Sequence, residues 1–418
     1  MKVLLVGSGG REHALAWKLA RSPSVTELVA APGNAGIAEV ARLAGRGAHP
    51  DDLLRLAEEE SVDLVVIGPE APLVAGLSDS LRERGIAAFG PGEAGARLEG
   101  SKAYAKEFMA RYGVPTAQHR TFVDQGSALD YLRLKGAPVV VKDSGLAAGK
   151  GVTVAEEEAE AEEAVRRIFA GSRHEPRVVI EERLQGQEFS YLVFTDGETY
   201  RPMPIAQDYK QAEEGDLGPM TGGMGTVAPV GLLDATSREQ VEREIVERTL
   251  AGLSSEGIDY RGVLYFGLML TDAGPRLLEY NVRFGDPETQ VVVPLLDTDL
   301  VEVMLAVAER RLGELELSWR QGSAACVVMA APGYPAAYRR GIPITTYEPT
   351  EDLLLFHAGT ERREGRLVSS GGRVLDVVGL AEGTEEAVLR AYQGVAMVDF
   401  PGAHYRKDIG SRLLGRRP

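Results

Sequence analysis

The sequence predicts a multidomain protein of the α/β and α+β classes that begins with a doubly wound parallel sheet. Three observations lead to this fold class. Roughly the first hundred residues alternate short apolar runs with helical patterns, glycine or proline turns follow the apolar runs, and paired strands with tight turns begin after about Val114. The 418 residues exceed what one hydrophobic core usually serves, so about two to four domains are expected.

The N-terminal region is expected to alternate buried strands with helices. The strands are predicted at Lys2–Val6, Glu27–Ala31, Asp63–Ile67 and Ile86–Phe89. The helices are predicted at Glu12–Ala20, Asp51–Glu60, Leu77–Arg84 and, leaving the domain, Leu98–Tyr112. Ligands of open α/β sheets bind at the carboxyl ends of the strands, so we expect binding residues in the turns that follow them.

The middle of the chain is expected to be α+β, and the end of the chain mostly strands. Tight turns at Asp196-Gly197 and Asp272-Ala273-Gly274 join predicted strand pairs. A long charged helix is predicted at Arg238–Ser254, between these two pairs. After about Gly322 strands predominate, and one helix, Glu385–Val395, closes the region.

The composition argues against several classes of protein. The formal net charge of −16 at pH 7 disfavours nucleic acid and anionic membranes as partners. The single cysteine, Cys326, rules out an intramolecular disulfide and is typical of a reducing compartment. No apolar run has the length of a membrane span or of a signal peptide. We therefore expect a monomer that acts on small molecules in the cytoplasm, with no nucleic acid or membrane partner.

A glycine turn follows the first strand and opens the first helix, as Gly7-Ser8-Gly9-Gly10-Arg11-Glu12. It resembles a dinucleotide fingerprint but departs from it, because Glu12 stands where the third glycine would be. A glycine turn at a helix N-terminus can still bind a phosphate or a carboxylate. The alternative is a tight turn that binds no ligand.

A second glycine-rich segment, Asp143–Gly151, joins the predicted strands Val139–Lys142 and Val152–Ala155. It differs from a P-loop, which would lead into a helix. Glycines let a backbone approach phosphates closely, and Lys142 brings a cation to the same place. The alternative is a surface hairpin with a solvated lysine.

Two further groups of polar residues end predicted strands. Glu181 and Glu182 end an apolar strand and Glu188 follows them, a pattern that is more often only solvated. Glu279 and Asn281 alternate with apolar residues and so share one strand face. Their oxygens suit Mg²⁺, and Arg283, on the same face, can meet a phosphate. The alternative is a network of polar contacts within a turn.

Together these segments resemble the ATP-grasp ligases and, among them, the glycinamide ribonucleotide synthetase family. The segments that carry the resemblance run almost end to end: Gly9–Trp17, Ala31–Gly36, Gly68–Leu73, Gly145–Val152, Thr221–Gly225, Asn281–Glu288 and Arg406–Gly410. Gly267 departs from the wider superfamily, which often has a metal-binding carboxylate there. The segments Asp143-Ser144 and Met220 depart from the family pattern beside two glycine loops.

The resemblance implies an ATP-grasp fold with four regions. Residues 1–100 would form the substrate-binding domain with the doubly wound sheet. Residues 101–190 would form the small lid region, with the glycine hairpin and the adenine hinge. Residues 191–322 would form the central region that binds ATP and metal, and residues 323–418 a small C-terminal β-rich domain.

The resemblance also implies which residues form the site. ATP would be bound by Lys102, Lys142, Gly145, Gly149, Lys150, Glu181, Glu182, Leu184 and Glu188. Mg²⁺ or Mn²⁺ would be held by Glu279 and Asn281, with Glu288 as a candidate third ligand, and catalysis would depend on Lys142 and Arg283. The other substrates would meet Gly9, Gly10, Asn34, Glu70, Thr221, Gly222, Gly223 and Asp286.

The implied reaction joins glycine to 5-phosphoribosylamine at the expense of ATP, through glycyl phosphate. Three rival functions remain at this point. One is an ATP-grasp ligase for a different carboxylate, and a second is a nicotinamide oxidoreductase, which the incomplete fingerprint disfavours. The third is a nucleotide-binding protein without catalysis, which would be expected to lack Lys142, Glu279 or Asn281.

Overall fold

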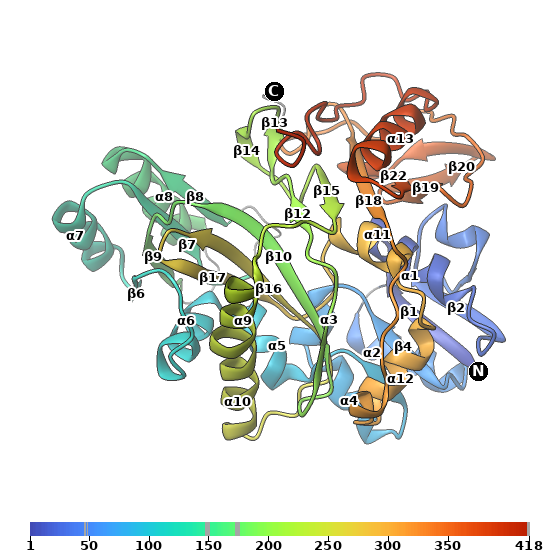
Figure 1. The fold of residues 1–418 in the computed structure, drawn as a ribbon, viewed down its shortest axis with the longest axis horizontal. Helices are drawn as coiled ribbons and strands as arrows, with labels where there is room; N and C mark the ends of the chain where they lie inside the picture. The colour runs from blue at the N-terminus through green and yellow to red at the C-terminus, as the bar shows by residue number, and fades with distance from the viewer. Residues whose placement is uncertain (46, 48, 147–150, 172–175, 416–418) are drawn as a thin grey trace.

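A computed structural model describes residues 1–45, 47, 49–146, 151–171 and 176–415 (Figure 1). The chain forms an N-terminal parallel sheet, two antiparallel four-stranded sheets and a C-terminal five-stranded sheet, together with two short hairpins. Gly149 and Lys150, which are among the predicted ATP-binding residues, lie outside the described residues. The expected fold class is confirmed.

The N-terminal sheet has the strand order β3-β2-β1-β4-β5, and all its strands are parallel. Its strands are β1 (Lys2–Gly7), β2 (Glu27–Pro32), β3 (Arg42–Leu43), β4 (Leu64–Ile67) and β5 (Ala87–Phe89). Its helices are α1 (Gly10–Leu19), η1 (Ile37–Glu39), α2 (Pro50–Glu59), α3 (Glu70–Val74) and α4 (Leu77–Glu83). Apart from β3, the strands match the predicted ones within two residues at each end, because buried parallel strands are almost wholly apolar.

The chain leaves this sheet through two helices, α5 (Glu93–Gly100) and α6 (Lys102–Arg111). The single helix predicted for Leu98–Tyr112 was wrong, because Ser101 between them is extended, with φ −143° and ψ 104°. The Ser101 hydroxyl accepts a hydrogen bond from the Tyr104 amide and so caps α6. Serine is a preferred N-cap because its side chain pairs an otherwise unpaired amide.

The lid is a separate antiparallel sheet with its own core, and it lies at the left of Figure 1. Its strand order β6-β9-β7-β8 combines β6 (His119–Phe122), β9 (Val178–Glu182), β7 (Val139–Asp143) and β8 (Val152–Ala155). Two helices, α7 (Gln125–Lys135) and α8 (Glu158–Gly171), pack on this sheet. The predicted glycine hairpin is therefore the connection between β7 and β8, which pair antiparallel from Lys142 and Val152 outward.

The central sheet, β11-β10-β16-β17, carries the strand with Glu279 and Asn281. Its strands are β10 (Gln187–Thr195), β11 (Tyr200–Pro202), β16 (Gly262–Thr271) and β17 (Gly274–Asn281). The predicted charged helix is a continuous helical run of α9 (Ala235–Gln240), a π-helical turn η2 (Val241–Val246) and α10 (Glu247–Ser255). After β17 follow α11 (Glu288–Val292), η3 (Val293–Leu295), α12 (Leu300–Ala308) and η4 (Leu312–Glu314).

The C-terminal sheet takes strands from two distant parts of the chain. Its order is β12 (Gln207–Asp208), β15 (Gly225–Ala228), β18 (Ser323–Ala330), β22 (Arg373–Ala381) and β19 (Leu353–His357). Helix α13 (Thr384–Ala396) packs on β18 and β22. The hairpins are β13 (Gln211–Glu213) with β14 (Leu217–Met220), and β20 (Thr360–Arg363) with β21 (Arg366–Ser369). None of the helices described here combines the length and apolar character that crossing a membrane requires.

Candidate active site

Strand β17 carries the predicted site residues Glu279 and Asn281, and Arg283 follows just beyond its end. Glu279 pairs with Gly267 and Asn281 with Tyr265 on the neighbouring strand β16. A Cβ atom at Gly267 would lie 3.2 Å from Cγ of Glu279, so the glycine leaves room for the glutamate side chain. The Asn281 Oδ1 atom accepts a hydrogen bond of 3.1 Å from Nη2 of Arg283. The alternation read from the sequence thus brings these side chains together.

Four cations surround the Glu279 carboxylate. Burial alone would raise the pKa of Glu279, but Lys210, Lys142, Lys102 and Arg283 outweigh burial and hold that pKa below its usual value. The nearest of these cations is Lys210, whose Nζ lies 4.0 Å from Oε1 of Glu279. Glu279 is therefore an ionised oxygen donor in a field of positive charge, which suits a site for anionic ligands.

The predicted metal ligands Glu279 and Asn281 present two oxygen donors of the kind that Mg²⁺ and Mn²⁺ bind. Among the residues described, no three histidine, cysteine or acidic side chains gather as a metal site. Mg²⁺ is commonly held by one or two protein oxygens together with substrate phosphates and water. The two donors fit that pattern. Glu288, the candidate third ligand, is buried and its Oε1 accepts hydrogen bonds from Ser190 and Tyr265 at 2.9 and 2.7 Å.

The lid meets the central sheet through Lys142 at the end of β7. Its Nζ donates to Oε2 of Glu181 at 3.0 Å and to the Leu278 carbonyl oxygen on β17 at 3.2 Å. Lys102 begins α6 and donates from its Nζ to the Gly145 carbonyl oxygen at 2.9 Å. The structure therefore brings Lys102, Lys142, Gly145 and Glu181 together where the lid meets the central sheet.

Three further predicted ATP-binding residues lie where β9 leaves the lid and β10 enters the central sheet. The Glu182 Oε1 atom accepts a hydrogen bond of 2.8 Å from the Gln118 amide. Leu184 is half-buried in the short connection between the two strands. The Oε2 atom of Glu188 lies 3.1 Å from Nζ of Lys210. The predicted residues therefore lie on the segment that joins the lid sheet to the central sheet.

Arg283 is held by carboxylates from the N-terminal half of the chain. Its Nη2 donates to Glu99 at 2.8 Å, and its Nε lies 3.5 Å from Oε2 of Glu70. Glu99 also accepts a hydrogen bond from the Val282 amide at 2.7 Å. Burial raises the pKa of Glu99, whereas for Glu70 burial is outweighed by Arg283 and Arg11 and the pKa is lowered. Glu99 was missed in the sequence because it lies in an ordinary amphipathic helix.

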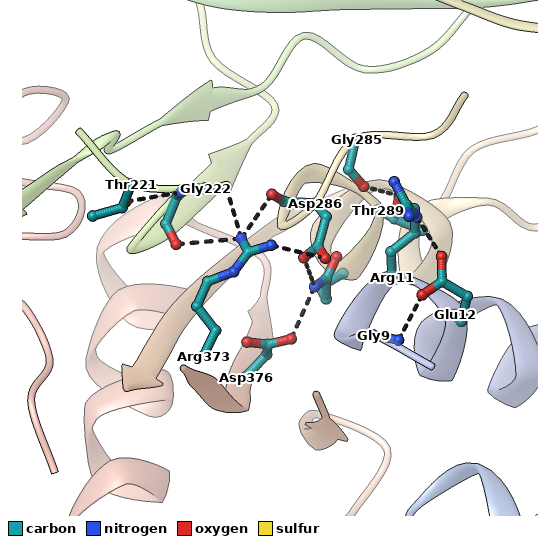
Figure 2. A network of polar contacts seen from close by, with 12 residues as sticks. Gly9, Arg11, Glu12, Thr221, Gly222, Gly285, Asp286, Thr289, Arg373 and Asp376 are labelled. Carbon is teal, nitrogen blue, oxygen red and sulfur yellow. Dashed lines mark hydrogen bonds and ion pairs between the residues drawn. The ribbon is translucent and has the colours of Figure 1, made fainter. Parts of the chain in front are cut away.

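The glycine turn before α1 is filled by the protein's own carboxylate (Figure 2). The Gly9 amide donates to Oε2 of Glu12 at 2.6 Å, and Arg11 donates from Nε to Oε1 of Glu12 at 2.5 Å. Cβ atoms at Gly7 and Gly68 would clash with the Glu12 side chain. A dinucleotide pyrophosphate would need the position that Glu12 occupies. This geometry argues against the nicotinamide oxidoreductase.

A second polar network joins strand β22 of the C-terminal sheet to the loop after β14 and to the segment around α11 (Figure 2). From β22, Arg373 donates from Nη1 to the carbonyl oxygens of Gly222 and Asp286 at 2.7 and 2.9 Å. Its Nη2 lies 3.0 Å from Oδ2 of Asp286. An arginine far away along the chain, with no motif around it, therefore brings the predicted residues Gly222 and Asp286 together.

Asp376, three residues after Arg373 on β22, completes this network. The Nε2 of Gln290 donates both to Oδ1 of Asp286 at 2.8 Å and to Oδ2 of Asp376 at 2.9 Å. Burial, and then the charge of Asp286, raise the pKa of Asp376 to about 7. A Cβ atom at Gly10 would lie 1.7 Å from Oδ2 of Asp376, so the turn needs glycine there.

The glycine loop after β14 is fixed from both sides. The Thr221 hydroxyl donates to the Lys210 carbonyl oxygen at 2.8 Å and accepts from the Gly223 amide at 3.0 Å. Gly223 has φ +114°, and a Cβ atom there would lie 2.4 Å from Cδ of Pro287 and 2.8 Å from Oδ1 of Asp208. Only glycine suits that position.

The side-chain amide of Asn34 forms hydrogen bonds with backbone groups of the protein itself. Its Nδ2 donates to the carbonyl oxygens of Ser8 and His357 at 2.9 and 2.6 Å. Its Oδ1 accepts from the amides of Gly36 and Ile37, both at 2.9 Å. These bonds use the hydrogen-bonding capacity of the amide. The side chain therefore ties the first sheet to the C-terminal sheet.

Three family models match consecutive parts of the chain. They are the N domain, the ATP-grasp (A) domain and the C domain of phosphoribosylglycinamide synthetase, over residues 1–99, 100–289 and 324–412. Among curated relatives, the phosphoribosylamine–glycine ligase of Brucella melitensis is 47% identical and spans 100% of this chain and 99% of its own length. The ligase of the same name from Nostoc sp. is 48% identical over 99% of this chain and 100% of its own length.

Solved structures give the same assignment. The phosphoribosylamine–glycine ligase of Thermotoga maritima superposes with a TM-score of 0.87 and 38% identity, covering 98% of this chain and 100% of its own. The biotin carboxylase domain of the 2-oxoglutarate carboxylase of Hydrogenobacter thermophilus, at 18% identity and a TM-score of 0.73 over 97% and 91% of the two chains, shares the fold. The chain belongs to the phosphoribosylglycinamide synthetase family, whose central domain is an ATP-grasp domain.

Proposed function

We propose that this chain is an ATP-dependent ligase that joins the carboxylate of glycine to the amine of 5-phosphoribosylamine. The products are glycinamide ribonucleotide, ADP and phosphate, a step of purine biosynthesis. Relatives named phosphoribosylamine–glycine ligase align along the whole chain at 46–48% identity, which supports the assignment. The observation that carries it is the cation cluster around Glu279, where lid and central sheet meet.

ATP is proposed to lie between the glycine hairpin and β17. Lys102 and Lys142 supply the positive charge for its phosphates, and both converge on this space from different elements. Glu181, Glu182 and Leu184 would frame the adenine, and Glu188 would accept the ribose hydroxyls. Phosphoryl transfer depends mainly on positioning and charge neutralisation, which such a cluster provides.

Mg²⁺ or Mn²⁺ is proposed at Glu279 and Asn281. When bound, the ion would neutralise charge on the ATP phosphates. Glu279 is kept ionised by the surrounding cations, and Asn281 is oriented by its hydrogen bond to Arg283. The chain's own residues thus hold two oxygen donors ready at one strand end.

The first chemical step activates glycine, because a free carboxylate is a poor acyl donor. A carboxylate oxygen attacks the γ-phosphorus of ATP, the bond to the β–γ bridging oxygen breaks, and ADP leaves. Arg283 steadies the transferring phosphate or the glycine carboxylate. Its guanidinium is fixed by Glu99 and Glu70, so it needs little rearrangement during the step. Closure of the lid would protect glycyl phosphate from water.

The second step forms the amide. The amine nitrogen of phosphoribosylamine attacks the acyl carbon, the carbon–oxygen bond to phosphate breaks, and the nitrogen loses a proton. We propose that this substrate lies against Gly9, Gly10, Glu70, Asp286 and the loop Thr221-Gly222-Gly223. Asn34 would act there through the backbone it holds, since its side chain is already engaged.

We further propose that the enzyme works as a monomer in the cytoplasm on small molecules only. The net charge of −16 disfavours nucleic acid and anionic lipid as partners. The one cysteine, Cys326, is buried, so it is shielded from exchange with other thiols.

The test is release of ADP from ATP with Mg²⁺, glycine and freshly formed phosphoribosylamine, omitting one component at a time. We expect turnover to require glycine and the amine together. Turnover that ignores the amine but needs another carboxylate would instead identify an ATP-grasp ligase with a different substrate.

A further inference from the structure

Lys106 is a buried cation that has no role in the proposed binding of ATP or in the two proposed chemical steps. It lies on α6, one helical turn after Lys102, and its side chain is 2% exposed. Its Nζ lies 3.1 Å from Oε2 of Glu181 and donates to the Thr116 hydroxyl at 2.7 Å. Burial lowers the pKa of Lys106 to about 8, against the opposing effect of Glu181. Such a group is costly to bury, so packing alone does not account for it.

Glu181 is shared between two lysines. Its carboxylate, also 2% exposed, lies 3.0 Å from Nζ of Lys142 and 3.1 Å from Nζ of Lys106. Two buried cations therefore face one buried anion, which leaves an excess positive charge. With Lys106 absent, Glu181 and Lys142 would form a neutral pair, and less of the Lys142 charge would be available to a ligand.

Both lysines are also tied to the strand that carries Glu279. Lys142 donates directly to the Leu278 carbonyl oxygen at 3.2 Å. Lys106 reaches the adjacent carbonyl through Thr116, whose hydroxyl donates to the Leu277 oxygen at 2.6 Å. Two consecutive carbonyls of β17 thus set the positions of the two ammonium groups relative to Glu279.

We propose that Lys106 is a positioning residue for ATP: by sharing Glu181 it keeps the Lys142 ammonium available to, and aimed at, the triphosphate. The inference rests on the proposed role of Lys142 at the ATP phosphates. Lys106 itself lies behind Glu181 and acts through it. An anionic ligand in front of Lys142 balances the excess charge of the two lysines.

The arrangement also predicts a pH dependence of ATP binding. The charged groups that act on Lys106 are Glu181 on β9, Lys142 on β7 and Glu279 on β17. Because the folded-state pKa of Lys106 is lowered, its charge is lost as pH rises through about 8. We therefore expect ATP affinity to fall above that pH in the native chain and to lack this decline in Lys106→Met.

The experiment is calorimetric titration of the full chain with a non-hydrolysable ATP analogue plus Mg²⁺, and separately with adenosine. Lys106→Met should weaken binding of the triphosphate on the order of tenfold and leave adenosine binding unchanged. Methionine keeps most of the length of the lysine side chain without its charge, and Glu181 retains Lys142 as its partner, so the fold should persist. The matched control is Lys135→Met at the exposed end of α7.

A double-variant cycle separates positioning from mere stability. If Lys106 acts through Glu181, the effects of Lys106→Met and Glu181→Gln on triphosphate affinity will not add. Equal weakening of triphosphate and adenosine, or unchanged triphosphate affinity with a lowered Tm, would overturn the inference. Absence of any ATP binding by the native chain would instead refute the proposed function, so the two failures are distinguishable.

Discussion

Two clusters of charge line the candidate site, and their charge balance differs. Beneath the lid, the lysines Lys102, Lys106 and Lys142 outnumber the carboxylates Glu181 and Glu279. Beside β22, two neighbouring carboxylates, Asp286 and Asp376, lie together, and Asp286 is paired with the Arg373 guanidinium.

The difference indicates which chemistry each cluster suits. Excess positive charge beneath the lid favours the phosphates of ATP. The two neighbouring carboxylates beside Gly10 disfavour a phosphate at Asp376 and favour hydroxyl or amine donors, whose hydrogens carboxylates accept. The helix N-terminus at Gly9 would by itself suit an anion, but Glu12 already fills it. The glycine turn is therefore a place of close packing more than a phosphate cradle.

The largest expected effect is on kcat, when the Glu279 carboxylate in the cluster beneath the lid is replaced. Glu279→Gln removes the charge that we propose holds a divalent ion and leaves the surrounding cations unbalanced, so kcat should fall about 100-fold to 1,000-fold. The measurement is ADP release at saturating glycine and amine over a range of Mg²⁺ concentrations. Glu302→Gln on the exposed face of α12 is the control. Full activity of Glu279→Gln at ordinary Mg²⁺ would remove Glu279 from the metal site.

A smaller and more selective effect is expected from the second cluster. Arg373→Met frees the Gly222 carbonyl and Asp286, so the KM for phosphoribosylamine should rise about tenfold while the KM for ATP stays unchanged. Steady-state kinetics with each substrate varied in turn checks this. Arg366→Met, on the exposed hairpin strand β21, serves as the control. Equal rises in both KM values would mean that the two clusters do not act on separate substrates.

The smallest expected effect is a change in thermal stability with pH, and it tests the raised pKa of Asp376 in the second cluster. The folded-state pKa of Asp376 is raised to about 7, so the folded protein binds a proton that the unfolded chain has lost, and stability falls as pH rises from about 4 to 7. Asp376→Asn should remove that loss. We expect its Tm to exceed the native value by about a few degrees at pH 8 and to match it near pH 5.

Thermal unfolding at the two pH values, with Asp272→Asn as an exposed control, measures this difference. The same Tm gap at both pH values would show that Asp376 does not titrate in this range.

Much of the fold could be predicted from local pattern. The strands β1, β2, β4 and β5 are nearly all apolar because both faces of a parallel sheet are covered. Glu279 and Asn281 were found because strand alternation assigns them to one face. By contrast, the break at Ser101 depends on a single capping hydroxyl within a stretch of otherwise helical residues. Strand β12, with only Gln207 and Asp208, is too short to leave a pattern.

The site residues that could not be predicted from the sequence have one property in common: their partners lie far away along the chain. Arg373 meets Gly222 and Asp286, which lie 151 and 87 positions away along the chain. Lys106 meets Glu181 across the boundary between a helix and the lid sheet. Asp376 lies within an apolar strand that reads only as core. Such roles arise from contacts between distant segments, and no local spacing records them.

The composition of the C-terminal sheet limits how this chain can be divided. Strand β15 lies between β12 and β18, so a fragment that began at residue 323 would lack two of the five strands. It would leave the wholly buried strand β18 with an unpaired edge, a template for aggregation. Dividing the chain at residue 323 would therefore separate strands that pair with each other in one sheet. A fragment that keeps all five strands of this sheet must include residues 207–228.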